Sequence, residues 1–364
     1  MNKLHGLNLL RAISMIMVFI CHTPIVPSIK NFRDYYKISG VFTDIGAIPV
    51  SIFFIISGLV MAHNHKNATK RGLLFHLYSF WIRLAKFYPL ALLITIIGIP
   101  FALLGSLSDR VNWFSVPINL LLLQSYFPLS NFSGVCWFLS TLCFAYLFFP
   151  LLLNLINTLG KTYSLLFIFI MYLIPFFFSP FFYSDFLYTF FYSFPLYRVY
   201  EFLLGIYIAI YLLPYGKTKS HNIDILIFTS FLLIFCIVIL KTQFPFLYMI
   251  VATKTMFTPF TAFVVYLLAI TRKGLFYNLS QHKIIVFLSS ISLPFFLLHQ
   301  ISLRTLRFVL LFFNLQEHCL INIIAIIVLF FFLILFCYLY KTHISAFFQE
   351  KMLAINPFNR KGKS

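Results

Sequence analysis

Arg11 and His22 share one apolar stretch near the start of the chain, and their spacing could support chemistry. At about 100° per residue, eleven positions end about 20° from a whole number of turns, so the two side chains would point the same way, roughly 16 Å apart along a helix. An arginine fork suits phosphate, and histidine is the most frequent general base near neutral pH. One helix face would then carry an anion-binding group and a proton acceptor. The alternative is an arginine at the inner headgroups and an unrelated histidine at the outer interface.

Two further pairs of ionisable residues are three positions apart, within side-chain reach on a helix. Arg83 and Lys86 would form a basic face suited to pyrophosphate, although ordinary positive charge in a cytoplasmic loop gives the same pattern. Arg198 and Glu201 can neutralise one another at a membrane boundary. They are candidates for a structural ion pair or for groups that orient a substrate.

His299 lies deep in a long apolar stretch, where an ionisable side chain is costly and is a functional candidate by default. Pro294 removes a helical hydrogen bond and permits a kink beside a cavity. We expect His299 at a depth similar to that of His22; the alternative is a histidine bonded within the bundle. His63 and His65 are two positions apart and do not share a helix face, so we expect no metal site.

The composition excludes a water-soluble globular enzyme, a disordered chain and a coiled coil. Of the 364 residues, 62% are hydrophobic and only 10% are charged, and the mean hydropathy is +0.97; soluble domains are about 45–50% apolar and about 25% charged. The net charge of +19 comes from 27 basic and 8 acidic residues. Because the basic residues lie mostly in short loops and near the C-terminus, membrane topology explains them better than nucleic acid does. We expect membrane lipids as partners and no nucleic acid.

The apolar stretches predict an all-α, polytopic integral membrane protein built as a helical bundle. A spanning helix needs about 20 mostly apolar residues. Stretch 114–129 is short and contains Pro117 and Pro128; if it spanned, the basic loop at Lys217 would lie outside the cell. We therefore predict about ten spanning helices and one re-entrant or interfacial segment, 114–129. The eleven stretches are residues 7–26, 45–62, 87–104, 114–129, 135–158, 163–182, 199–213, 223–240, 246–270, 284–312 and 320–340.

The distribution of basic residues also predicts the orientation. The loop over residues 63–86 is rich in lysine and arginine, which places it and both termini in the cytoplasm. We expect one transmembrane domain over residues 1–341 and a basic cytoplasmic tail over 342–364.

Six short motifs together resemble the acyltransferase 3 family, which consists of membrane O-acyltransferases of surface polysaccharides and other cell-envelope molecules. Each motif is weak by itself, but they occur in the family's order over residues 7–299. Four of them are an arginine, ten residues and a histidine within 7–22; F-F-x-x-S-G at 51–59; W-x-L followed by F-P at 137–150; and P-x-x-R-x-x-E-F-x-x-G at 195–205. The other two are R-L-A-K-F-Y-P at 83–89, which is similar to the family's third motif R-x-x-R-I-x-P, and S-L-P-F-F-L-L-H at 292–299, which is similar to its S-Y-x-x-Y-L-x-H.

The resemblance implies the activity and several roles. The donor would be acetyl-CoA from the cytoplasm, and the acceptor a hydroxyl of a polysaccharide or lipid-linked glycan at the outer face of a bacterial inner membrane. His22 would be the catalytic histidine, and Arg11, Arg83 and Lys86 would bind the donor. We add His299 as a second catalytic candidate that orients groups or stabilises the oxyanion.

Two departures from the family pattern affect the candidate site. Lys86 stands where the third motif has its second arginine, which keeps the charge but loses the bidentate fork. The W-x-L helix of the family often carries a glutamate soon afterwards, whereas Leu142 and Cys143 occupy that region here. The family also often has a periplasmic hydrolase-like domain, and we expect the membrane domain alone.

A transporter or flippase for a lipid-linked or anionic solute is the alternative from another class. Internal inverted repeats would favour it, and the sequence shows none. Activity with acetyl-CoA would distinguish the two. The sequence does not specify the acceptor sugar, the hydroxyl that is modified or the oligomeric state.

Overall fold

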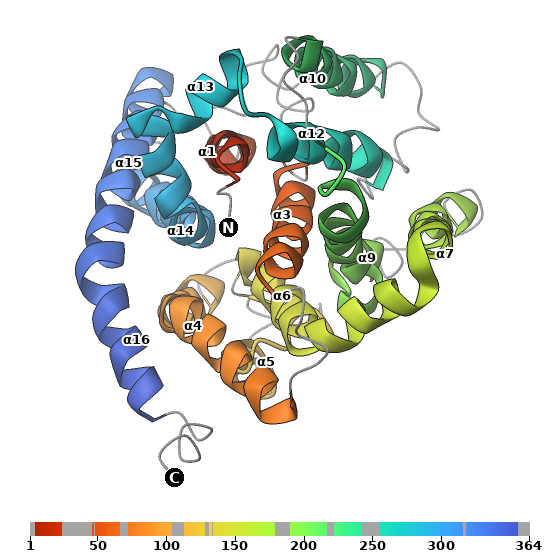
Figure 1. Cartoon of the computed structure of the whole chain (residues 1–364). Helices are drawn as coiled ribbons and strands as arrows, with labels where there is room; N and C mark the ends of the chain where they lie inside the picture. The colour runs from red at the N-terminus through yellow and green to blue at the C-terminus, as the bar shows by residue number, and fades with distance from the viewer. Residues whose placement is uncertain are drawn as a thin grey trace. The chain divides into compact units, whose positions relative to one another are not determined.

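The computed structural model describes residues 4–23, 46, 48–65, 72–103, 113–127, 131–132, 134–178, 190–216, 222–241, 255–315 and 318–355. All regular structure in these residues is helical, and they contain no strand (Figure 1). The prediction of an all-α protein is therefore confirmed for this part of the chain. The loop at Lys217, most of the first predicted outer loop and residues 356–364 lie outside the described residues.

The chain divides into two compact units, each assembled from separate stretches of sequence. The first comprises residues 1–21, 37–66 and 151–292, and the second comprises residues 22–36, 67–150 and 293–364. Three of the described helices, α1 (Gly6–His22), α7 (Phe149–Phe178) and α14 (Lys283–Phe312), contribute to both units. Arg11 therefore belongs to the first unit, whereas His22 and His299 belong to the second.

The first unit is organised around α3 (Ile48–Asn64). Helix α9 (Pro195–Tyr207) packs along α3, α12 (Thr258–Ile270) contacts both, and α10 (Asn222–Lys241) contacts α12 (Figure 1). The other elements of this unit are α7 (Phe149–Phe178), η7 (Ile208–Leu212), η8 (Thr255–Phe257) and α13 (Leu275–Gln281).

Two glycines let the main chains of α3 and α9 meet. A Cβ atom on Gly58 would collide with the carbonyl oxygen of Phe202, and one on Gly205 would collide with that of Ile55. Each helix therefore presents a glycine to the backbone of the other. Lipid is as apolar as the side chains, so burial of apolar surface does little to hold two helices together in a bilayer. Close packing of the kind seen here is a main source of helix association instead.

The second unit is organised around α4 (Leu73–Leu103), which contacts α5 (Ser115–Leu120), α6 (Trp137–Leu147) and α16 (Ser345–Ala354). The indole N–H of Trp81 donates to the carbonyl oxygen of Met352 at 2.7 Å and joins α4 to α16. Helix α15 (Cys319–Leu339) continues through the π-helical turn η9 (Tyr340–Ile344) into α16. The described part of the predicted tail is therefore helical. A short 3-10 helix, η6 (Gly134–Cys136), precedes α6.

Helix α4 begins earlier than the sequence pattern predicts. The apolar stretch starts at residue 87, and the preceding residues were expected to form a loop, but the helix begins at Leu73 and contains Arg83 and Lys86. Its first turns mix aromatic and basic side chains, so an apolar run does not reveal them. The prediction of a loop at these two residues was wrong.

The described residues contain five helices that are long and apolar enough to cross a membrane, or six if the bent pair α12 and α13 is one span. A multi-pass membrane protein is supported, and the predicted number of about ten spanning helices is not confirmed. The described part of segment 114–129, which ends at residue 127, consists of the six-residue α5 with turns on either side of it. The five helices are Leu73–Leu103, Phe149–Phe177, Phe190–Leu212, Lys283–Phe312 and Leu320–Ala354, and the shorter apolar helices of 10–17 residues are Gly6–His22, Ile48–Asn64, Gly134–Leu147 and Ile223–Ile237.

Helix α7 is broken at Gly160. The backbone there has φ 71° and ψ −177°, a conformation that favours glycine because it has no Cβ. The break falls between the two predicted stretches 135–158 and 163–182, so the sequence pattern placed this boundary correctly.

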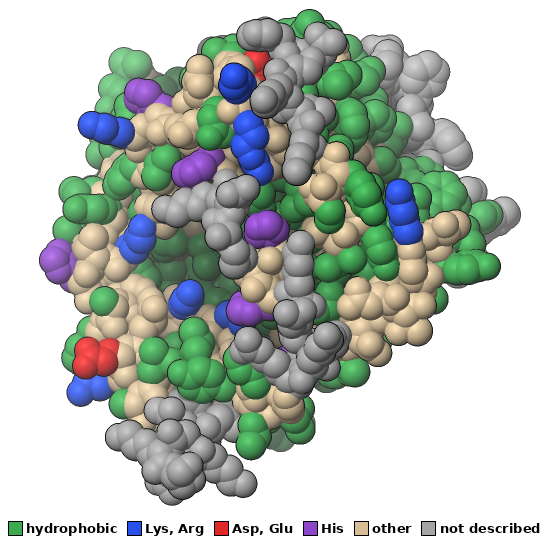
Figure 2. All heavy atoms as spheres, in the orientation of Figure 1, with side chains coloured by type: hydrophobic (Ala, Val, Ile, Leu, Met, Phe, Trp, Pro, Cys, Tyr) green, Lys and Arg blue, Asp and Glu red, His purple; other side chains and the backbone are tan. Residues whose placement is uncertain are grey.

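Hydrophobic side chains dominate the molecular surface seen in Figure 2, with basic and histidine side chains scattered among them and few acidic ones. Many large apolar side chains on the long helices are exposed, among them Leu151, Phe169 and Phe331. Exposed apolar surface on this scale suits contact with lipid and not with water.

The contact between α3 and α9 predicts that neither glycine accepts a larger side chain. We expect Gly58→Leu and Gly205→Leu each to lower the free energy of unfolding by about 1–3 kcal/mol or more, because the partner backbone cannot move aside. The measurement is the thermal unfolding midpoint of the detergent-solubilised protein.

Gly72→Leu is the matched control, because nothing lies within 4 Å of a Cβ at that position. A midpoint for Gly58→Leu equal to that of Gly72→Leu would contradict the close packing of α3 on α9.

Candidate active site

His22 and His299 meet in the second unit. Nδ1 of His22 lies 3.2 Å from Nε2 of His299, and the ring centroids are 4.8 Å apart with an interplanar angle of 66°. His22 is the last residue of α1 and is partly exposed, whereas His299 of α14 is wholly buried. The sequence predicted two histidines at a similar depth, and the structure places them in direct contact.

The partners of His299 determine which ring nitrogens carry hydrogen. Nδ1 of His299 lies within hydrogen-bond distance of the carbonyl oxygen of Phe296, which can only accept, so this Nδ1 must donate. A neutral ring costs less to bury than an imidazolium, so Nε2 of His299 is the acceptor and Nδ1 of His22 donates to it. In this tautomer Nε2 of His22 holds the lone pair that can take up a proton.

Aromatic packing holds His299 in place. The ring of Phe296 lies 5.7 Å from the ring of His299 and 5.0 Å from the ring of Phe138, measured between centroids. Phe138 belongs to α6, the helix that carries the W-x-L motif. The motif helix therefore packs on the turn of α14 that carries His299.

Arg11 lines a polar pocket near the start of α1, with a volume of about 520 Å³. Its described lining residues include one arginine, two histidines and three side-chain amides, and none of them is acidic. Because these described lining residues include a cation and amide donors but no carboxylate, they suit an anion. No role at an anion site was predicted for His5 or His63, which line this pocket. The polar lining residues are His5, Asn8, Arg11, His63, Asn64 and Gln281.

Arg83 and Lys86 lie on α4 in different surroundings. Nη1 of Arg83 donates to the carbonyl oxygen of Ser79 at 2.8 Å, and its guanidinium lies 5.7 Å from the ring centroid of Tyr146. Lys86 is exposed. Both residues belong to the second unit and Arg11 to the first. Part of the hydrogen-bonding capacity of Arg83 is thus used within the protein, while the Lys86 ammonium reaches the surface.

Glu201 is the centre of a buried polar cluster in the first unit. Its carboxylate pairs with Arg198 through contacts of 2.9 Å and 3.1 Å, and the two side chains are 0% and 1% exposed. The hydroxyl groups of Ser51 and Thr258 donate to Oε1 of Glu201 at 2.6 Å and 3.1 Å. The hydroxyl of Tyr200 lies 3.4 Å from the same oxygen and 2.9 Å from the hydroxyl of Thr258.

This Glu201 cluster joins three helices. Arg198 and Glu201 lie on α9, Ser51 lies on α3 and Thr258 begins α12. The structure forms the ion pair that the spacing of Arg198 and Glu201 suggested. Sequence spacing did not identify the hydroxyl partners, because they come from helices far apart in the chain.

The comparisons with known proteins agree with one another. A sequence model described as an acyltransferase domain matches residues 4–342. Acyltransferase MdmB of Streptomyces mycarofaciens is 32% identical over 165 residues, which are 43% of this chain and 40% of that protein. The match thus spans less than half of the length of that relative. No solved structure matches the chain.

Because Arg198 and Glu201 are buried together, removal of one of the two charges should lower the stability of the protein strongly. Glu201→Gln leaves the Arg198 cation buried without its counter-charge, which should cost about 3–5 kcal/mol. We expect a large drop in the thermal unfolding midpoint in detergent.

The double variant Arg198→Met with Glu201→Gln removes both charges and should recover much of that loss. If the double variant is no more stable than the single one, the pair does not stabilise the unit through its charges.

Proposed function

Because the chain belongs to the acyltransferase 3 family, we propose that it is a membrane O-acetyltransferase that moves an acetyl group from cytoplasmic acetyl-CoA to a hydroxyl of a cell-surface glycan. The contact between His22 and His299 is the observation that carries this proposal. The acceptor would be the O-antigen of a lipopolysaccharide, a capsule or an exopolysaccharide. We place the protein in a bacterial inner membrane with both termini in the cytoplasm.

In the proposed reaction, His22 is the general base. Its Nε2 takes the proton of the acceptor hydroxyl while the hydroxyl oxygen attacks the thioester carbonyl. The new C–O bond forms, the C–S bond breaks, and the protonated His22 returns its proton to the leaving thiolate of CoA. His299 keeps His22 in the tautomer whose Nε2 is basic, so we assign it as a positioning residue.

The polar pocket at Arg11 supports a donor that carries phosphate groups. Arginine binds phosphate oxygens through its fork, and the amides and histidines that line the pocket can add further hydrogen bonds. We place Arg11 toward the end of α1 that faces the cytoplasm. We propose Arg83 and Lys86 as further donor-binding residues.

The test of the proposed function is a transfer assay with the purified protein in detergent. Acetyl-CoA should be consumed, and the acetyl group should appear on an added surface glycan, detected as a mass increase in mass spectrometry. A transporter would show neither thioester cleavage nor acetyl transfer, and that outcome would refute the proposal.

The proposed role of His22 as general base predicts how its variants lose transfer activity. We expect His22→Ala and His22→Gln to lose transfer activity by about 10²–10⁴-fold, the usual contribution of a general base. Glutamine can hydrogen-bond but cannot take up a proton. Both variants should remain folded and bind CoA with unchanged affinity, as measured by calorimetry.

His299→Gln is the comparison. Because His299 is a positioning residue and His22 remains as the proton acceptor, His299→Gln should lower kcat less than the His22 variants do. It should also shift the pH profile of kcat. Near-normal turnover in His22→Gln together with an inactive His299→Gln would show that the roles are reversed.

If the Arg11 pocket binds the donor, substitutions of Arg11 should lower the affinity of the protein for CoA. Arg11→Ala should weaken CoA binding about tenfold or more, which corresponds to about 1.4 kcal/mol. Arg11→Lys should restore only part of the affinity because the fork is lost. The measurement is the Kd of CoA for each purified variant.

Arg307→Ala removes an exposed cation from α14 that does not line the pocket, and it should leave the Kd unchanged. An Arg11→Ala protein that binds CoA as tightly as the Arg307→Ala protein would remove Arg11 from the donor site.

A further inference from the structure

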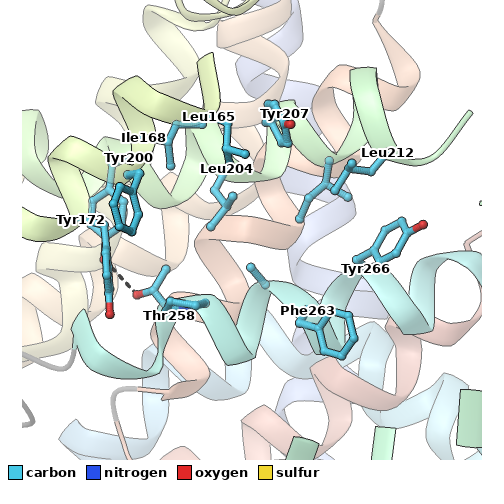
Figure 3. Close-up of a pocket in the computed structure, with 14 residues that line it drawn as sticks. Leu165, Ile168, Tyr172, Tyr200, Leu204, Tyr207, Leu212, Thr258, Phe263 and Tyr266 are labelled. Carbon is cyan, nitrogen blue, oxygen red and sulfur yellow. Dashed lines mark hydrogen bonds between the residues drawn. The ribbon is translucent and has the colours of Figure 1, made fainter. Parts of the chain in front are cut away.

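A second pocket lies within the first unit, between α7, α9 with η7, and α12 (Figure 3). Its volume is about 320 Å³, within the range of about 300–1,000 Å³ that is typical of ligand pockets. Aliphatic and aromatic side chains make up nearly all of its lining, and none of its described lining residues is charged. They include Leu165 and Phe169 of α7, Leu204 and Tyr207 of α9, and Phe263 and Tyr266 of α12.

The pocket reaches the apolar outer surface of the unit. Leu165, Phe169 and Phe263 line it and are also 48%, 51% and 44% exposed. The neighbouring Leu166 and Ile170 of α7 are exposed as well and do not line the pocket. Helix α7 is one of the five candidate spans, so its exposed side chains would contact hydrocarbon. A ligand would therefore enter from the bilayer.

The polar atoms at the inner side of the pocket already have partners. The hydroxyl groups of Tyr200 and Thr258 are 2.9 Å apart (Figure 3), and both also contact the carboxylate of Glu201. Both residues are buried. A ligand at this position needs no hydrogen bond, which favours a hydrocarbon chain over a sugar or a nucleotide.

We propose that this pocket binds one acyl chain of a phospholipid from the surrounding bilayer. An apolar cavity of this kind excludes water, whereas acyl chains are abundant at its mouth. The chain would pack against the same Tyr200 and Thr258 side chains that surround Glu201, and so would support the Glu201 cluster from outside. This proposal does not depend on the transferase activity.

The test is photo-crosslinking in proteoliposomes of phosphatidylethanolamine and phosphatidylglycerol that contain a phospholipid with a diazirine in its acyl chain. We expect adducts on the residues that line the pocket in α9 and α12, mapped by mass spectrometry of the peptides. Ala262→Trp places a large side chain in the pocket and should reduce these adducts about tenfold, a loss of about 1.4 kcal/mol of binding.

Leu166→Trp is the matched control, because it adds the same ring to the lipid-facing side of α7 outside the pocket; its adducts should equal those of the wild type. If Ala262→Trp does not fold, the positions of the adducts on the wild-type protein test the proposal by themselves. Wild-type adducts confined to outward-facing residues would overturn the proposal, as would adducts unchanged by Ala262→Trp. Labelling of the pocket by a diazirine polyprenyl phosphate and not by the phospholipid would overturn it too.

Discussion

A carboxylate inside a lipid bilayer must find all of its partners within the protein, and Glu201 satisfies this requirement by drawing three helices together. Water is not available there to solvate an unpaired charge, so each contact with Arg198, Ser51 and Thr258 replaces a lost hydrogen bond. These contacts connect α3, α9 and α12 in the first unit. The glycine contacts between α3 and α9 bring the helices close enough for a short serine side chain on one to reach a carboxylate on the other.

The two polar centres differ in how much of each is exposed. Glu201 is bonded to side chains of the first unit, and its side chain has no exposed surface. The histidine pair has one wholly buried ring and one partly exposed ring. A group that exchanges protons with a substrate must reach the substrate, so the histidine pair suits chemistry, and the Glu201 cluster suits the maintenance of the fold.

The sequence predicts those features that depend on local pattern. Apolar runs indicate most helices, and Gly160 falls between two of them. The loop expected at Arg83 is a helix, because basic and aromatic residues interrupt the apolar pattern there. The depth of His22 and His299 follows from counting residues along each helix. Their contact does not, nor do Ser51 and Thr258 as partners of Glu201, because these depend on packing between helices that are distant in the chain.

The bond from His299 to the carbonyl oxygen of Phe296 has a consequence for where protons can travel. A histidine passes a proton along a chain only if the ring can release hydrogen on its far side. Here the far side faces a backbone carbonyl, which has negligible basicity, so His299 cannot pass a proton onward through this bond. The neutral ring of His299 is therefore suited to holding the ring of His22 in one orientation.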